Sequence, residues 1–238
     1  QKIAAGEKDK INVTPAMVKA MLGPEKVKPT FISRTDAVGI ANGLAWTSVG
    51  GEMLPIEVSI IPNGSGKVEI TGSLGDVMKE SAHLALTYAR VHAETYHIAP
   101  DKFKNTDIHI HAPEGAVPKD GPSAGVTLTT ALISALSEIP VRHDLAMTGE
   151  ITLHGNVLPI GGLKEKSMAA FREGISTVLI PEANKPDLYE VDEEVKKAVK
   201  FIPVSDLSQV LKHALILPAA SAAHKRTCLL YTSPSPRD

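Results

Sequence analysis

The segment Pro118–Gly125, with the sequence PKDGPSAG, most constrains how this chain can fold. It follows an alternating run, Asp107–His111, that is typical of a β-strand. It leads into Val126–Leu136, which is apolar almost all round and long enough for a buried helix. Pro122 fixes its own φ and favours an extended conformation for the residue before it, so the chain must turn sharply. Ser123 is therefore predicted to lie where an irregular loop becomes a buried helix.

Three interpretations of Ser123 follow from this position. A serine at a helix start is a common N-cap, a role that needs only its oxygen. The segment also matches the G-x-S-x-G turn that presents a nucleophilic serine, although such a turn follows directly on a strand and here Pro118 to Asp120 intervene. A nucleophile here would have the helix dipole and free backbone N–H groups to stabilise an oxyanion. The third interpretation is a phosphate site, against which Asp120 and the missing N–H of Pro122 count.

A nucleophilic serine needs a base, and the sequence offers two kinds. Asp206 with His213 fits the order Ser, Asp, His of some hydrolase triads, but the solvated face of a surface helix also explains this pair. A lysine base would have to be desolvated, so that its pKa falls from about 10.4 towards neutrality. Lys164 and Lys166 both follow Gly161–Gly162 at a predicted helix start, where the dipole disfavours positive charge. Helical periodicity does not choose between these two lysines.

Composition and charge argue against several classes of protein. The 238 residues are 43% apolar and 22% charged, which is typical of a globular chain with a sizeable core. The net charge is −2 and there is no basic block, so nothing indicates nucleic acid or an anionic membrane as a partner. No apolar run approaches the ~20 residues of a membrane span, and the first residues do not resemble a signal peptide. The single cysteine, Cys228, excludes an intrachain disulfide and indicates a reducing compartment.

Two further patterns suggest ligand sites and are rejected. Gly64–Lys67 matches part of a phosphate-binding loop, but that motif requires other residues where Ile61 and Val68 stand. His109 and His111 lie two apart on a predicted strand and therefore point the same way, as two metal ligands can. No third ligand lies at a suitable spacing, so no metal site is predicted.

The chain divides into three predicted parts. Residues 1–35 hold one short helix, with Thr14 as N-cap and Pro15 at its first position, and then a mostly polar linker. Residues 36–217 begin with hairpin strands and continue with alternating helices and strands, which predicts an α+β domain. Residues 218–238 have no periodicity and end in alternating Ser-Pro, so we expect a disordered, vector-derived tail.

Within the middle part, hydrophobic periodicity and turn residues assign the elements. Ser205 is the expected N-cap of the last helix. A short strand followed by a Gly-Gly turn is expected within 39–51. Further strands are expected at 53–61, 68–71, 107–111, 145–147, 151–153, 177–180 and 201–204, and helices at 74–96, 126–136, 163–173, 195–199 and 205–215.

Three motifs together closely resemble the signatures of the Lon protease family. The likeness extends from about Gly43 to Leu215, and it implies a Lon proteolytic domain with an α+β fold like that of ribosomal protein S5 domain 2. The motifs are PKDGPSAG at Pro118–Gly125, MTGEI at Met147–Ile151 and LPIGGLKEK at Leu158–Lys166.

The resemblance implies a role for each matching residue. Ser123 is implied as the nucleophile, Lys166 as its general base and Thr148 as the residue that holds the lysine by a hydrogen bond. Asp120 lies close enough in sequence to tune or block the site. The supporting loop residues implied with it are Gly121, Pro122 and Ala124.

The implied function is that of an ATP-dependent serine endopeptidase, which hydrolyses unfolded or damaged proteins through a Ser-Lys dyad and an acyl-enzyme. The family also implies polypeptide substrates, homo-hexameric rings and a bacterial cytoplasm, with the mitochondrial matrix as the alternative. No cofactor is expected in this part of the protein. ATP and Mg²⁺ are expected only for an ATPase module, of whose small helical subdomain residues 1–35 resemble a remnant. A serine hydrolase with a Ser-His-Asp triad and a non-catalytic binding module of the same fold remain as alternatives.

Overall fold

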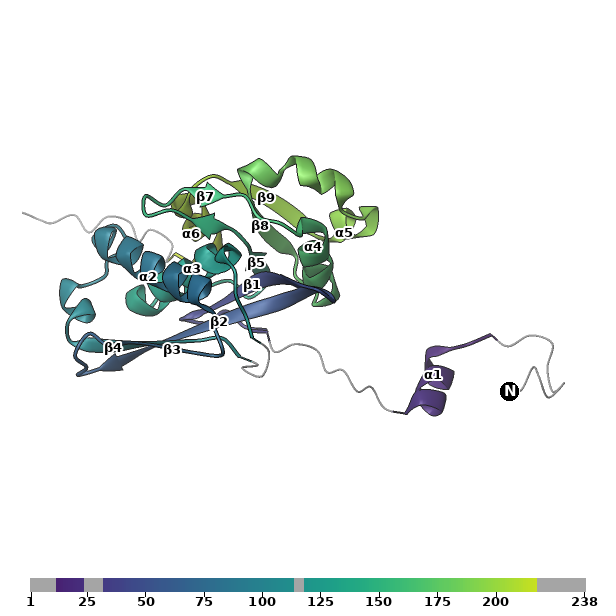
Figure 1. Ribbon diagram of the computed structural model, residues 1–238, viewed down its shortest axis with the longest axis horizontal. Coiled ribbons are helices and arrows are strands. Elements are labelled where there is room, and N and C mark those ends of the chain that lie inside the picture. Colours follow the sequence, from purple (N-terminus) through teal and green to yellow (C-terminus); the bar gives the residue numbers. More distant parts are fainter. Residues whose placement is uncertain (1–11, 24–31, 114–117, 218–238) are drawn as a thin grey trace, which may run out of the picture. The chain divides into compact units, whose positions relative to one another are not determined.

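The computed structural model describes residues 12–23, 32–113 and 118–217 (Figure 1). The chain forms two compact units, residues 1–31 and residues 32–238, and each is described by itself. The predicted tail at 218–238, with its single cysteine, lies outside the described residues. None of the helices within the described ranges has the length and apolar character needed to cross a membrane.

The first unit contains helix α1 (Pro15–Leu22). The Thr14 side chain caps it by accepting a hydrogen bond from the backbone N–H of Met17 at 3.3 Å. Gly23, with φ of 83°, ends the helix, which is a common use of a residue without a Cβ. The predicted cap and first position of this helix are therefore confirmed.

A mixed seven-stranded sheet forms the centre of the second unit. Its strands are β1 (Ile40–Thr47), β2 (Gly50–Pro62), β3 (Val68–Thr71), β4 (Thr106–His111), β5 (Leu145–Met147), β8 (Thr177–Pro181) and β9 (Lys200–Val204). A small separate hairpin consists of β6 (Glu150–Ile151) and β7 (Val157–Leu158). The order across the sheet is β3-β4-β2-β1-β5-β8-β9 (Figure 1). β1 pairs antiparallel with β2, and β2 with β4, whereas the other neighbours pair in parallel.

Helices pack on both faces of this sheet, which fits the predicted α+β class. They are α2 (Asp76–Val91), α3 (Gly125–Ser137), α4 (Leu163–Arg172), α5 (Glu193–Ala198) and α6 (Leu207–Ala214), with short 3₁₀ turns η1 (Pro100–Phe103), η2 (Pro122–Ala124), η3 (Glu182–Asn184) and η4 (Pro186–Glu190). The side chains of successive strand residues point to opposite faces of the sheet, so they pack into two different hydrophobic cores. Leu54 joins a core with residues of α2, α3 and α6, whereas its neighbour Met53 joins one with residues of α4 and α5.

Several predicted element ends differ from the structure, and two of these differences have a clear physical reason. Among the others, the strand expected at 53–61 is β2, which begins at Gly50, and the strand expected at 151–153 is β6, which ends at Ile151. The helix expected at 74–96 is α2, which ends earlier than predicted, at Val91. Beyond it, His97 has a positive φ of 55°, which is incompatible with a right-handed helix. The prediction that Ser205 caps the last helix is wrong. Its backbone carbonyl accepts a hydrogen bond from the backbone N–H of Val157, which attaches Ser205 to β7. The cap is the next residue, Asp206, whose carboxylate accepts from the first turn of α6.

Gly51 marks a close approach between the β1–β2 hairpin and α4. A Cβ at Gly51 would lie 1.9 Å from the backbone oxygen of Glu165, so only a residue without a side chain fits. The carbonyl of Gly51 also accepts a hydrogen bond from the Arg172 side chain at 2.8 Å. These two contacts hold both ends of α4 against the hairpin.

We predict that Gly51→Ala lowers the free energy of unfolding by about 1–3 kcal/mol, because the added methyl group overpacks this contact. Urea denaturation measures the change. Gly161→Ala is the matched control, since a Cβ there meets no atom within 4 Å. It is expected to change stability by less than about 0.5 kcal/mol. Equal stability of the two variants would contradict the close packing of α4 on the hairpin.

Candidate active site

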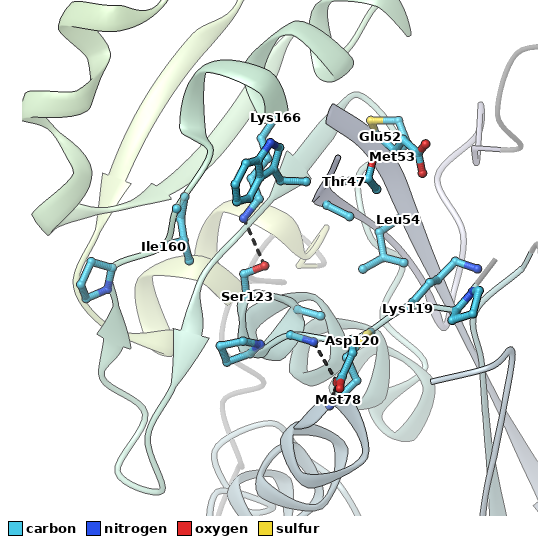
Figure 2. A pocket seen from close by; sticks show the side chains of 18 residues that line it. Thr47, Glu52, Met53, Leu54, Met78, Lys119, Asp120, Ser123, Ile160 and Lys166 are labelled. Atoms are coloured by element: carbon cyan, nitrogen blue, oxygen red, sulfur yellow. Dashed lines mark hydrogen bonds between the residues drawn. The ribbon is translucent and has the colours of Figure 1, made fainter. Parts of the chain in front are cut away.

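A cavity of about 360 Å³ lies beside the start of α3 (Figure 2). It is lined mainly by the β1–β2 hairpin, the loop at 118–124 and the loop before α4, together with Met78 of α2 and Lys166 of α4. Apolar side chains, among them Leu54, Met78 and Ile160, form much of its wall. Into this apolar space point the side chains of Ser123 and Lys166, which face each other in Figure 2.

Ser123, Lys166 and Thr148 form one hydrogen-bonded group. The Nζ of Lys166 lies 3.1 Å from the Oγ of Ser123 and 3.1 Å from the Oγ1 of Thr148. Thr148 follows the end of β5, and its hydroxyl also lies 3.4 Å from the backbone carbonyl of Ser123. The structure thus brings together the three residues that the sequence motifs single out.

The cap interpretation of Ser123 is wrong. Ser123 lies within the 3₁₀ turn η2, and α3 begins two residues later at Gly125, with Ala124 as an N-cap that makes no side-chain bond. The Ser123 carbonyl accepts from the backbone N–H of Gly149 at 2.9 Å. Its hydroxyl is thereby left to Lys166 rather than to the helix.

The packing of α4 decides which lysine reaches Ser123. Leu163, Lys166 and Ala170 lie on the buried face of the helix, whereas Lys164 is exposed. Gly162 begins the helix with φ of 68°, and a Cβ there would lie 2.8 Å from Cγ of Trp46. The Trp46 side chain therefore packs against Gly162, the residue that precedes α4.

Burial lowers the pKa of Lys166 from 10.5 to about 8. The side chain is only 2% exposed, and no carboxylate among the described residues forms an ion pair with it. Two hydroxyl groups are poorer partners for an ammonium than bulk water is. A substantial fraction of the amine is thus neutral near pH 8, and a neutral amine can accept a proton.

The remaining residues of the predicted loop take different positions. The carboxylate of Asp120 accepts from the backbone N–H groups of Gly121 and Met78 and points away from Lys166 (Figure 2). Gly121 has φ of 133°, a conformation that favours glycine. Pro122 and Ala124 line the cavity on either side of Ser123.

The other candidate bases and ligands lie elsewhere. No histidine belongs to the wall of the cavity, as far as the described residues define it, and Asp206 caps α6 instead of orienting His213. His109 and His111 both form hydrogen bonds with the Thr71 hydroxyl, at 2.9 and 2.7 Å. Within the described ranges, no group of three or more potential metal-ligating side chains comes together.

The sequence alone does not identify the residues that shape the cavity. Met78 and Leu54 read as ordinary core positions of a helix and a strand, and nothing in their spacing indicates that both face Ser123. Trp46 offers a weak signal, because it is the only tryptophan of the chain.

At this site a serine hydroxyl lies beside a buried amine whose pKa is lowered, a combination that can support acyl transfer. Comparison with known proteins gives the family. Residues 12–217 match the Lon protease (S16) C-terminal proteolytic domain. The chain is 54% identical over 215 residues to the Lon protease of Trichlorobacter lovleyi, and the aligned region covers 90% of this chain and 26% of that protein. It is 51% identical over 213 residues to the Lon protease of Brevibacillus choshinensis (90% and 27%) and 53% identical over 212 residues to Lon protease 1 of Myxococcus xanthus (89% and 26%).

The chain therefore belongs to the Lon protease family. It spans about a quarter of the length of these relatives. The family assignment made from the three sequence motifs is confirmed.

Lys166→Met provides a stability test of the buried amine. A pKa that falls from 10.5 in the unfolded chain to about 8 in the fold destabilises the protein by about 3 kcal/mol at pH 7. Between those two values the unfolded chain binds more protons than the fold, so this penalty is present below pH 8 and disappears as the pH rises to 10.5. We predict that Lys166→Met is more stable than the wild type at pH 7, and that the difference shrinks at pH 10.

Urea denaturation at both pH values checks this result. Lys164→Met is the control, because it removes an exposed lysine two residues away and is expected to change stability by less than about 0.5 kcal/mol at either pH. A Lys166→Met variant that is less stable than the wild type at pH 7 would contradict a desolvated ammonium.

Proposed function

We propose that this chain hydrolyses peptide bonds as a serine endopeptidase, with Ser123 as the nucleophile and Lys166 as its general base. The observation that carries the proposal is the 3.1 Å contact between the serine Oγ and the Nζ of a buried lysine whose pKa is lowered to about 8. A base is most effective when its pKa lies near the working pH, and an exposed lysine does not meet this condition.

The reaction proceeds through an acyl-enzyme. Neutral Lys166 takes the proton of the Ser123 hydroxyl as Oγ attacks the peptide carbonyl carbon, and backbone N–H groups around Ser123 stabilise the oxyanion. The resulting ammonium gives its proton to the leaving amine as the C–N bond breaks. Water then attacks the ester with Lys166 again as base, which releases the second product. Thr148 keeps Nζ directed at Oγ by holding it from the other side.

An extended polypeptide is the substrate that the surroundings of Ser123 favour. β5 pairs with β1 only at Asn42 and Gly43, because the chain after β5 turns away towards Ser123. Among the described residues, no strand pairs with this side of β1 beyond Gly43, and its end at 45–47 lines the cavity. A peptide can therefore add to β1 as a further strand, with its carbonyl near Ser123.

The apolar wall suits a side chain of the same character. Leu54 and Met78 are buried and lie next to the nucleophile, so an apolar substrate side chain gains burial by entering between them. A charged side chain would lose its hydration there without gaining a partner.

Membership of the Lon protease family supports a wider proposal for the whole protein. We infer an ATP-dependent protease of unfolded or damaged proteins that assembles as a homo-hexamer in the bacterial cytoplasm. ATP and Mg²⁺ belong to an ATPase module beyond this chain, of which residues 1–35 represent the end of the small helical subdomain. Residues 36–217 then form the proteolytic domain proper, with the S5-domain-2-like arrangement, and the steps above use only its own side chains and water.

Charge-preserving replacement of the base tests the dyad. We predict that Lys166→Arg reduces kcat by more than about 10³-fold, as Lys166→Ala does, because a guanidinium with a pKa above ~12 cannot accept the serine proton. Lys164→Arg, on the exposed face of the same helix, is expected to retain activity within about twofold. Hydrolysis of a short fluorogenic peptide measures both.

Two further variants separate the alternatives. Ser123→Ala is expected to abolish hydrolysis with little change in the thermal midpoint, since Ser123 caps no helix. His213→Ala is expected to retain activity. A histidine-based triad would be favoured by substantial turnover of Lys166→Arg, or by loss of activity in a folded His213→Ala protein. A binding module would be favoured if the wild type is inactive and no serine reagent labels it.

A further inference from the structure

Helix α2 begins without a capping side chain of its own. Its N-cap is Gly75, which makes no side-chain bond, although the first N–H groups of a helix have no partner within it. One acceptor comes from the active-site loop instead. Oδ1 of Asp120 lies 3.2 Å from the backbone nitrogen of Met78, the third residue of the helix, and this is the N–H group that N-cap side chains usually bind.

The chain is shaped around this contact. A Cβ at Gly75 would lie 2.3 Å from Cγ of Asp120, so the missing side chain leaves the space that the carboxylate occupies. Two backbone hydrogen bonds flank it: Gly75 donates to the carbonyl of Lys119 at 2.7 Å, and Lys119 donates to the carbonyl of Ser73 at 3.0 Å. The loop is therefore attached to the start of α2 by three hydrogen bonds.

The attachment determines where Ser123 lies. Only Gly121 and Pro122 separate Asp120 from Ser123, and they have little freedom. The N–H of Gly121 also bonds to Oδ1 of Asp120, at 2.9 Å, and the ring of Pro122 fixes its φ. On its other side, Ser123 is held by the bond from Gly149 to its carbonyl. A shift of the loop at Asp120 therefore moves the serine relative to Lys166.

We propose that Asp120 is a positioning residue for the reaction, because its carboxylate caps α2 from the active-site loop and so sets the distance between Ser123 Oγ and Lys166 Nζ. The proposal rests on the proposed function, in which Ser123 is the nucleophile. The role requires an acceptor oxygen and does not require a negative charge. In Figure 2 the carboxylate lies beside Met78 and away from the lysine, so it does not act on the amine directly.

The test compares Asp120→Ala with Asp120→Asn in the intact protein. kcat and KM are measured with a short fluorogenic peptide, and the rate of Ser123 modification is measured with a fluorophosphonate. We expect Asp120→Ala to lower kcat and the modification rate by about 10- to 100-fold with KM within about threefold, because small misplacements of reacting groups have effects of this size. Asp120→Asn, whose amide oxygen can accept the same two hydrogen bonds, is expected to stay within about threefold of the wild type.

Asp76→Ala is the matched control. Asp76 lies in the first turn of the same helix, where its fully exposed carboxylate pairs with Lys79. Its loss is expected to lower the thermal midpoint as any change at the helix dipole does, and to leave kcat and the modification rate within about twofold. A purely stabilising role of Asp120 would give the same pattern in both alanine variants.

The proposal would be overturned by wild-type rates in Asp120→Ala, or by an equal loss of kcat and modification rate in Asp76→Ala. It would also be overturned if Asp120→Asn were as slow as Asp120→Ala. A changed midpoint of the pH–rate profile in Asp120→Asn would overturn it too, because the charge of Asp120 would then act on the reaction. If Asp120→Ala does not fold, Gly75→Ala displaces the carboxylate without removing it, and wild-type rates in that variant would equally overturn the proposal. Failure of the proposed function looks different, because Ser123→Ala would then retain hydrolysis.

Discussion

The structure of the site depends on a single lysine amine that is held out of water. Lys166 lies in the first turn of α4 and is almost fully buried, and its hydrogen-bond partners among the described residues are the hydroxyls of Ser123 and Thr148. An ammonium in this position is destabilised and an amine is not, so burial favours the neutral form, which can accept a proton. The same desolvation that lowers stability at neutral pH is what the proposed reaction requires of its base.

Several parts of the fold serve to keep that amine buried. The β1–β2 hairpin approaches α4 so closely that Gly51 can carry no side chain, and Trp46 covers the glycine that begins the helix. The end of β5 delivers Thr148 to one side of the amine and, through Gly149, fixes the serine loop. Helix α2 holds the other end of that loop. The site is therefore assembled from segments distant in sequence, each attached to the rigid sheet.

The sequence predicts the local features of this arrangement and leaves the long-range ones open. The change from an irregular loop to a buried helix at Ser123, the cap at Thr14 and the alternating strands follow from turn chemistry and periodicity, which are properties of neighbouring residues. The choice between Lys164 and Lys166 does not, because it depends on which face of α4 packs against the hairpin. Local rules allow both Ser205 and Ser123 to be helix caps. In the structure, the backbone carbonyl of each accepts a hydrogen bond from a residue distant in sequence, and neither serine caps its helix. The contact between Asp120 and α2 joins residues 42 positions apart and has no local signal.

The pH dependence of Ser123 modification tests the buried base most directly. A fluorophosphonate needs no peptide-binding subsite, so its rate of reaction reports only how well the serine is activated. If the neutral amine of Lys166 is the base, the rate rises about tenfold per pH unit at low pH and reaches a plateau, with a midpoint near 8. A midpoint near 6.5, the usual pKa of a histidine, or a rate that does not change with pH, would contradict the account.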